Sequence, residues 1–180
     1  MTNLARVAIL LGSVIAVIHA PCIVAPNSAR KWIRLFPRSK RSAWLLVAGD
    51  LVWVGWLVFN MPLERFGGLK PLLYLLVPAA FLLVINFMDE LLAARALGGL
   101  LLLVPALMLT AARWHESDLR FVVTVLAYLF AVAGMILVLS PYWFRKTMAF
   151  WIKNNSLCRI WGMLGFGFGM FIIFLGMAVY

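Results

Sequence analysis

Apolar residues follow one another along this chain in long stretches without charged side chains. Five stretches are uninterrupted and a sixth contains only Asp50; they cover residues 7–29, 42–63, 71–88, 96–112, 121–144 and 160–180. A helix needs about 17–25 residues to cross the hydrocarbon core of a membrane, so every stretch is long enough. The pattern therefore predicts six transmembrane helices.

The order of residues within these stretches argues against a β-barrel. Segments such as LLYLLV and GGLLLLV lack the alternation of apolar and polar residues that barrel strands show. Lipid offers no hydrogen-bond partner to backbone amides, so helices remain as the way to cross. The composition agrees, because 66% of the 180 residues are hydrophobic and 12% are charged, whereas soluble domains carry about 25% charged residues. We predict an all-α integral membrane protein with a single membrane domain over residues 1–180.

Two short basic segments follow the first and the fifth predicted helix. The cations of the first segment are Arg30, Lys31, Arg34, Arg38, Lys40 and Arg41, and those of the second are Arg145, Lys146 and Lys153. Apolar residues recur at helical spacing on the other face: Trp32, Leu35 and Phe36 in the first segment, and Phe144, Met148, Trp151 and Ile152 in the second. This pattern is typical of amphipathic helices in the membrane interface, where anionic lipid headgroups attract cations. The alternative is a pair of loops with anchoring cations.

The distribution of positive charge predicts an orientation. Short cytoplasmic loops carry an excess of Lys and Arg, and six helices place loops one, three and five on one side. That side collects eleven of the sixteen cations. We therefore expect a multi-pass protein of the bacterial inner (plasma) membrane with both termini on the non-cytoplasmic side. The net charge of +10 does not indicate nucleic-acid binding, because the cations lie at helix ends and no soluble domain offers a basic face.

The two basic segments are similar in sequence. APNSARKWIRLF begins at residue 25 and SPYWFRKTMAFW at residue 140, so a Pro, an Arg and a Lys recur at a constant offset of 115. Residues 4–60 and 119–176 are therefore predicted to be two tandem copies of one helical hairpin with the same orientation. ARALGG and CRIWGM indicate, more weakly, a third and shorter copy over 69–112.

This hairpin pattern resembles small uncharacterised two-helix inner-membrane proteins of bacteria. In that family a Pro and a short basic aromatic stretch link the helices, and an Arg near a Gly opens the second helix. The matching residues are Pro26, Arg30 and Lys31 in the first copy, and Pro141, Arg145, Lys146, Arg159 and Gly162 in the second. The first copy has no Arg-x-x-Gly spacing. The resemblance implies a membrane hairpin and brings no known activity.

Asp50 is the strongest candidate for chemistry inside the membrane. It lies within the second predicted helix, where Trp53 and Asn60 share its face. Ionisable residues at such depth are costly and usually face the interior of a helix bundle. The polar stripe either lines a proton or solute pathway or holds helices together.

A glycine face on the last predicted helix indicates close helix packing. Its members are Gly162, Gly165, Gly169 and Gly176. Gly165 and Gly169 form a small-x-x-x-small pair, which lets another backbone approach closely. The neighbour is either a helix of the same chain or a helix of another subunit.

The sequence contains no motif for catalysis, a metal or a cofactor. Its two histidines and two cysteines lack metal-ligand and redox spacing. We therefore expect a non-catalytic accessory or scaffold subunit of an inner-membrane complex, with other membrane proteins as partners. The alternative is a small channel or carrier with Asp50 on its pathway. An enzyme acting on lipid ranks third, because the basic segments lack a catalytic acid–base pair.

The predicted topology is tested by reporter fusions. A reporter that is active only outside the cytoplasm should be active at both termini and inactive when inserted in segment 142–153, because positive loops stay inside. Enzyme activity and protease accessibility are the measurements. Finding the termini on the same side as segment 142–153 would contradict the six-span topology.

Overall fold

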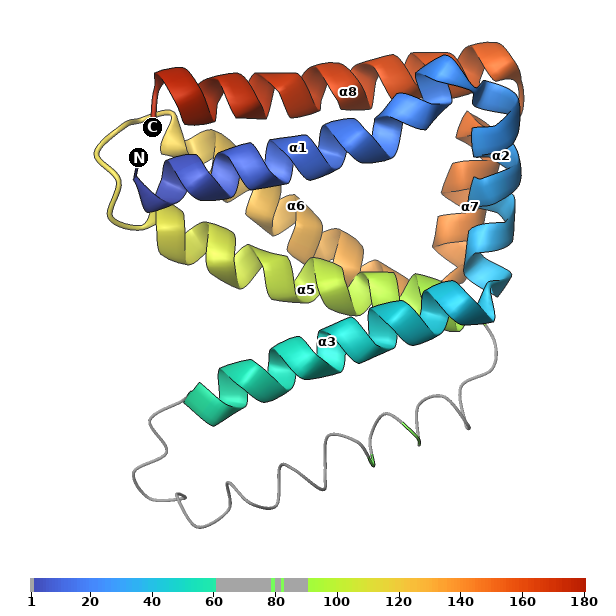
Figure 1. The fold of residues 1–180 in the computed structure, drawn as a ribbon, viewed down its shortest axis with the longest axis horizontal. Helices are drawn as coiled ribbons and strands as arrows, with labels where there is room; N and C mark the ends of the chain where they lie inside the picture. The colour runs from blue at the N-terminus through green and yellow to red at the C-terminus, as the bar shows by residue number, and fades with distance from the viewer. Residues whose placement is uncertain (1, 61–78, 80–81, 83–90) are drawn as a thin grey trace.

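The computed structural model describes residues 2–60, 79, 82 and 91–180, and the elements among them are all helical. In chain order they are α1 (Asn3–Val24), α2 (Pro26–Leu35), a 3-10 turn η1 (Phe36–Arg38), α3 (Lys40–Asn60), α5 (Leu92–Ala112), α6 (Arg120–Leu139), α7 (Tyr142–Trp151) and α8 (Asn155–Ala178). The predicted all-α class is confirmed (Figure 1).

Four of these helices, α1, α5, α6 and α8, are long and apolar enough to cross a membrane. The chain is therefore a multi-pass membrane protein, with four candidate spans among the described residues rather than the six predicted. The span predicted over 71–88 lies almost wholly outside the described residues. The one predicted over 42–63 is helical as far as Asn60, and the charged side chains of α3 are Lys40 and Arg41 at its start and Asp50 in its middle. Those charges make it the least apolar of the long helices.

Both basic segments form helices of ten residues, α2 and α7. α2 begins at Pro26 and α7 directly follows Pro141, positions where the missing N–H of proline is tolerated. α6 ends at Leu139, before Pro141, because proline disfavours the helical conformation in the residue that precedes it. In Figure 1, α2 and α7 lie at one end of the long helices and run across their direction.

The two chain termini meet at the opposite end of the structure (Figure 1). The Thr2 hydroxyl donates a hydrogen bond of 2.7 Å to the carbonyl of Tyr180, and the Tyr180 hydroxyl donates to the carbonyl of Leu119 at 2.6 Å. Leu119 immediately precedes α6, so the turn between α5 and α6 lies at this end too. The termini and this turn are thus separated from α2 and α7 by the length of the long helices.

The long helices pack in two close pairs, α1 with α8 and α5 with α6, while α3 packs against α5. Each pair is antiparallel (Figure 1). The main apolar core joins both pairs near the termini. Its buried members are Leu4, Ala8, Met108, Ala112, Val123, Leu126, Ala127, Ile172 and Leu175.

A reciprocal glycine contact lies at the crossing of each pair. A Cβ added to Gly12 would lie 2.6 Å from the carbonyl oxygen of Gly169, and one added to Gly169 would lie 2.7 Å from that of Gly12. The corresponding distances between Gly98 and Gly134 are 2.9 and 2.8 Å. Because lipid chains are as apolar as Leu, such close backbone packing is a main source of helix association in a membrane.

The glycine crossings are tested by a matched pair of substitutions on α8. Gly169→Ala should lower the free energy of unfolding by about 1–3 kcal/mol, because its methyl group meets the backbone of α1. Gly167→Ala is the control, since a Cβ there has no neighbour within 4 Å among the described residues, and Ala is the better helix former by about 1 kcal/mol. Thermal unfolding in detergent, followed by tryptophan fluorescence, is the measurement. Equal responses would contradict the close crossing.

Candidate functional site

The two basic helices pack against each other and form the most charged part of the structure. We call α2, η1 and α7 together the basic elbow. α2 and α7 lie side by side in Figure 1, although they are more than a hundred residues apart in sequence. The rings of Phe36 and Phe144 contact each other with centroids 5.6 Å apart, and Ala29 and Ile152 are buried beneath the charged surface.

Arg30 joins the two halves of the basic elbow. Its Nε donates to the carbonyl of Ile152 at 2.8 Å, its Nη2 to the carbonyl of Lys153 at 2.7 Å, and its Nη1 to Oδ1 of Asn155 at 2.7 Å. Ile152 is the C-cap residue of α7 and Asn155 is the first residue of α8. The guanidinium therefore satisfies carbonyls at the negative end of the α7 dipole while it contacts the start of the next helix.

A groove of about 380 Å³ lies between α2 and α7. Its lining combines three arginines, Arg34, Arg38 and Arg145, with apolar residues, Ile33, Pro37, Phe144, Met148, Ala149 and Ile152. The three arginines are exposed, whereas Pro37 and Ile152 are buried at its base. Sequence reasoning identified Arg34 and Arg145 as interface cations but did not place them around one groove.

The other predicted interface residues lie on the outside of the basic elbow. Lys31, Trp32, Lys146 and Lys153 are exposed and Trp151 is half-buried. The ammonium group of Lys146 lies 4.8 Å from the centre of the Trp143 ring, a cation–π distance. These side chains give the elbow a cationic and aromatic outer surface.

Asp50 faces α5 from the middle of α3. A Cβ added to Gly99 would lie 2.8 Å from Oδ2 of Asp50, so glycine is what gives the carboxylate room. Arg95 lies one turn before Gly99 on the same helix. Oδ1 of Asp50 and Nε of Arg95 are both buried, and neither has a hydrogen-bond partner among the described residues.

The other two residues of the polar stripe predicted around Asp50 lie further along α3. Asn60 is exposed and donates a hydrogen bond of 2.8 Å to the carbonyl of Trp56 in its own helix. Trp53 is half-buried. Asn60 lies about 15 Å along the helix from Asp50, because ten residues separate them. Of these three residues, Asp50 is the one whose side chain lies against Gly99 at the α3–α5 contact.

The glycine face of α8 lies against α1 of the same chain. Added Cβ atoms would meet Cys22 at Gly162, His19 at Gly165, Gly12 at Gly169, and Ile9 at Gly176. His19 is held by a 2.7 Å hydrogen bond between its Nδ1 and the carbonyl of Ile15 and by edge contact with Trp161. Cys22 and Cys158, which share no motif in sequence, lie in one buried cluster as free thiols. Among the described residues no group of three His, Cys, Asp or Glu side chains could hold a metal.

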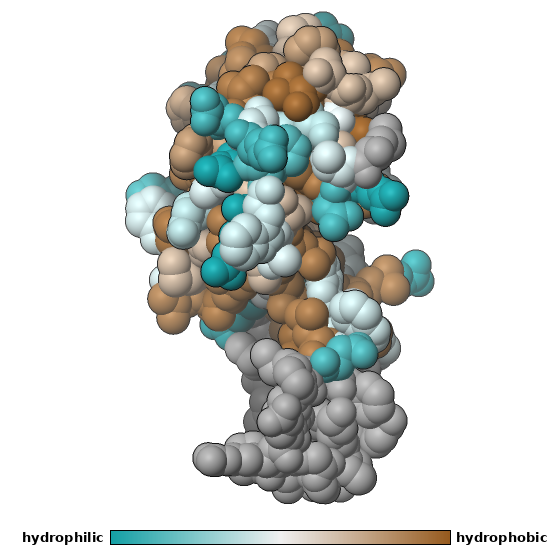
Figure 2. All heavy atoms as spheres, turned by 90° about the vertical axis from the view of Figure 1, so that its left-hand side faces the viewer, coloured by the Kyte–Doolittle hydropathy of each residue, from teal (hydrophilic) through white to brown (hydrophobic). Residues whose placement is uncertain are grey.

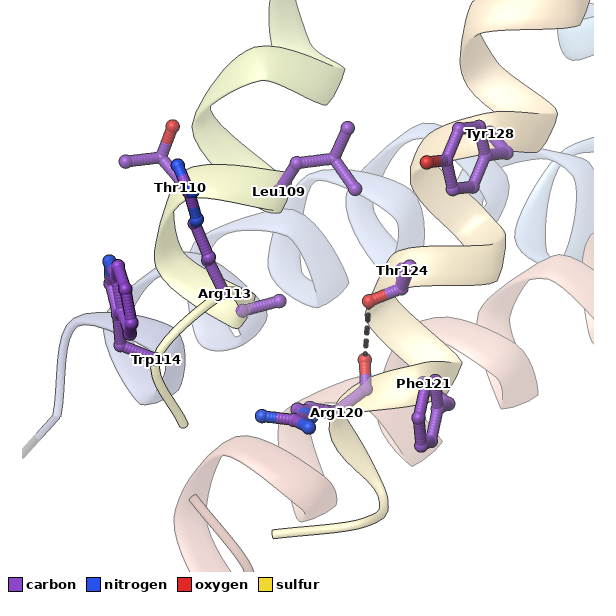
Figure 3. A pocket seen from close by; sticks show the side chains of 9 residues that line it. Leu109, Thr110, Arg113, Trp114, Arg120, Phe121, Thr124 and Tyr128 are labelled. Carbon is purple, nitrogen blue, oxygen red and sulfur yellow. Dashed lines mark hydrogen bonds between the residues drawn. The ribbon is translucent and has the colours of Figure 1, made fainter. Parts of the chain in front are cut away.

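A second pocket, which sequence reasoning missed, lies at the terminal end of the structure. It has a volume of about 460 Å³ and opens between the end of α5 and the start of α6 (Figure 3). Arg113 stacks over Trp114 at 5.1 Å, and Arg120 stacks over Phe121 at 5.5 Å and donates to the carbonyl of His115 at 2.5 Å. The sequence feature that could have predicted this pocket is the pair of Arg–aromatic dipeptides in RWHESDLRF.

Hydrophilic side chains gather on the end of the structure that carries the termini, which faces the viewer in Figure 2. Thr124 donates to the carbonyl of Arg120 at 3.1 Å (Figure 3). Burial raises the pKa of the Tyr180 hydroxyl above its usual value, and this hydroxyl donates to the carbonyl of Leu119. The two arginines here are already engaged with aromatic rings and a carbonyl, whereas the groove in the basic elbow presents three exposed guanidinium groups.

Comparisons with protein-family models, with curated proteins and with solved structures gave no match.

The role of Arg30 is tested by comparing it with its neighbour Lys31. Arg30→Gln should lower the free energy of unfolding by about 1–3 kcal/mol, because a half-buried guanidinium with three acceptors is lost, and Arg30→Lys should not restore it, because an ammonium lacks the planar fork. Lys31→Gln, on the exposed face of the same helix, should stay within about 0.5 kcal/mol of the parent. Thermal unfolding in detergent measures all three, and full rescue by Lys would contradict the forked contact.

Proposed function

We propose that this protein is a non-catalytic accessory or scaffold subunit of a bacterial inner-membrane complex. In this proposal six helices cross the membrane, the basic elbow lies on the cytoplasmic surface, and both termini lie on the other side. Other membrane protein subunits are the partners. The proposal needs no cofactor and no chemical step.

The observation that carries the proposal is the three-hydrogen-bond contact of Arg30 across the basic elbow. A scaffold needs a surface that keeps its shape, and here one guanidinium joins α2, the end of α7 and the start of α8. Lys31, Lys146 and Lys153 are exposed on this surface, where they are available to acidic groups of a partner. Positive charge on short loops supports a cytoplasmic location.

The proposed duplication is supported by the helix bounds. α3 begins at Lys40 and α8 at Asn155, an offset of 115, the same as the offset between the two sequence segments. α2 and α7 each have ten residues and start at corresponding positions to within one residue. Two hairpins of one kind, over 4–60 and 119–176, account for these bounds. The third copy over 69–112 is left with less support, because much of it lies outside the described residues.

The outer face of α1 supports a partner within the membrane. Leu10, Val14, Val17 and Ile18 are each more than half exposed, while Gly12 and Ala16 on the opposite face pack against α8. Such an apolar face is covered by lipid chains or by helices of another subunit. In the proposal it is where neighbouring subunits join.

The alternative function is a small channel or carrier with Asp50 on its pathway. The observation that favours it is the position of the Asp50 carboxylate, which lies against Gly99 at the contact between α3 and α5 rather than facing lipid. An ionisable side chain inside a helix bundle is a usual feature of proton and ion pathways.

Complex formation tests the scaffold proposal against the alternative. We expect the wild-type protein, extracted from native membranes in mild detergent, to run in native mass spectrometry with stoichiometric membrane subunits. Arg30→Gln should reduce the complexed fraction by about tenfold, which corresponds to the loss of about 1.4 kcal/mol. Asp50→Asn and Asp50→Leu should leave it unchanged, because Asp50 is remote from the basic elbow.

The same variants give the outcome that would overturn the proposal. A wild-type monomer that carries proton-coupled flux in proteoliposomes, with the flux abolished by Asp50→Leu, would establish the carrier function instead. Flux that is insensitive to both Asp50 variants would exclude that pathway.

A further inference from the structure

The groove of the basic elbow combines positive charge with an apolar surface. A site for a small hydrated anion would need only the positive charge. Arg34, Arg38 and Arg145 reach it from two different hairpins. Guanidinium groups present planar pairs of N–H donors that match phosphate oxygens, and they stay charged at any physiological pH. The lining residues that the structure describes include no carboxylate to compete for these donors.

The base of the groove is apolar. Ile33, Pro37, Phe144, Met148 and Ile152 contribute to it, and Pro37 and Ile152 are buried. A free phosphate ion is fully hydrated and gains no binding energy from an apolar surface. The glycerol and first acyl carbons of a lipid would cover this surface and remove it from contact with water. The combination therefore favours an amphiphile with an anionic head.

The groove also lies at the end of the structure where two candidate membrane spans end and the basic helices begin. α2 starts directly after α1, and α7 directly after α6, both of which are candidate membrane spans. Trp32, Tyr142 and Trp143 are exposed close to it, and Trp and Tyr are enriched where membrane meets water. Basic pockets between helices at this level are a recurrent form of phospholipid site.

Corresponding residues of the two proposed hairpins line the groove together. Ile33 and Met148 are 115 residues apart, as are Pro37 and Ile152, and all four line it. The groove therefore exists only when both hairpins are assembled. It offers one site for each chain, and not one for each hairpin.

We propose that this groove binds one anionic glycerophospholipid, with the phosphodiester held by Arg34, Arg38 and Arg145 and the glycerol region over the apolar base. Three cations around one phosphate favour a lipid with net negative charge, such as phosphatidylglycerol or cardiolipin, over zwitterionic phosphatidylcholine. The site goes beyond the scaffold function, because it needs no partner subunit and is present in the isolated chain.

Lipid titration of the purified full-length protein tests the site. Native mass spectrometry in a non-ionic detergent, with added phosphatidylglycerol, cardiolipin or phosphatidylcholine, should show one tightly retained anionic lipid. The triple variant Arg34→Gln, Arg38→Gln, Arg145→Gln should lose at least about tenfold in affinity for the anionic lipids, since each cation near a lipid surface contributes about 1 kcal/mol. Its affinity for phosphatidylcholine should not change.

The matched control removes the same charge from the outer surface of the basic elbow. Lys31→Gln, Lys146→Gln, Lys153→Gln should lose much less affinity, because none of these side chains lines the groove. If both triple variants lost the same affinity for anionic lipids, the binding would be explained by general electrostatic attraction to the surface, and the proposed site would be wrong. Elution volume and lipid-free unfolding temperature, equal in all variants, establish that the variants are folded.

Two further arms identify the source of the phosphate. Inorganic phosphate and water-soluble glycerophosphoglycerol should not displace the bound lipid at millimolar concentration. Displacement by either would assign the groove to a free anion instead. Because the titration uses the isolated protein, failure of the lipid site leaves the complex-formation result unaffected, and failure of complex formation leaves the lipid result unaffected.

Discussion

Close approach of helix backbones is the constraint on which the rest of the structure depends. Within a membrane no hydrophobic force draws one apolar helix to another, so association depends on packing that brings backbones together. Gly12 with Gly169 and Gly98 with Gly134 provide it at the two principal crossings. These crossings fix α1 against α8 and α5 against α6, and they thereby determine which chain segments meet at each end of the bundle.

The basic elbow is a consequence of that pairing. Once α1 and α8 are antiparallel neighbours, the helix that follows α1 and the helix that precedes α8 leave the bundle at the same end. Arg30 then finds the carbonyls of Ile152 and Lys153 within hydrogen-bond distance. The two segments both carry positive charge and would otherwise repel each other. This contact, together with the contact between the Phe36 and Phe144 rings, holds them side by side.

The two ends of the molecule use arginine differently. At the terminal end Arg113 and Arg120 stack on their aromatic neighbours and Arg120 binds a backbone carbonyl, so these cations fix a turn. In the groove of the basic elbow three exposed arginines surround an apolar base. Arginine thus stabilises the fold at one end of the molecule and remains available to a ligand at the other. Asp50, between the two ends, is accommodated by Gly99 on the facing helix.

The sequence by itself determined the helical membrane class, the two basic helices and the glycine face, because each depends on composition or spacing within one segment. It did not reveal that Arg30 contacts residues 122–125 positions away. Nor did it place Asp50 against Gly99, or Arg34, Arg38 and Arg145 around one groove. Only the tertiary structure decided these, because apolar helices of similar composition do not specify in sequence which of their faces will meet.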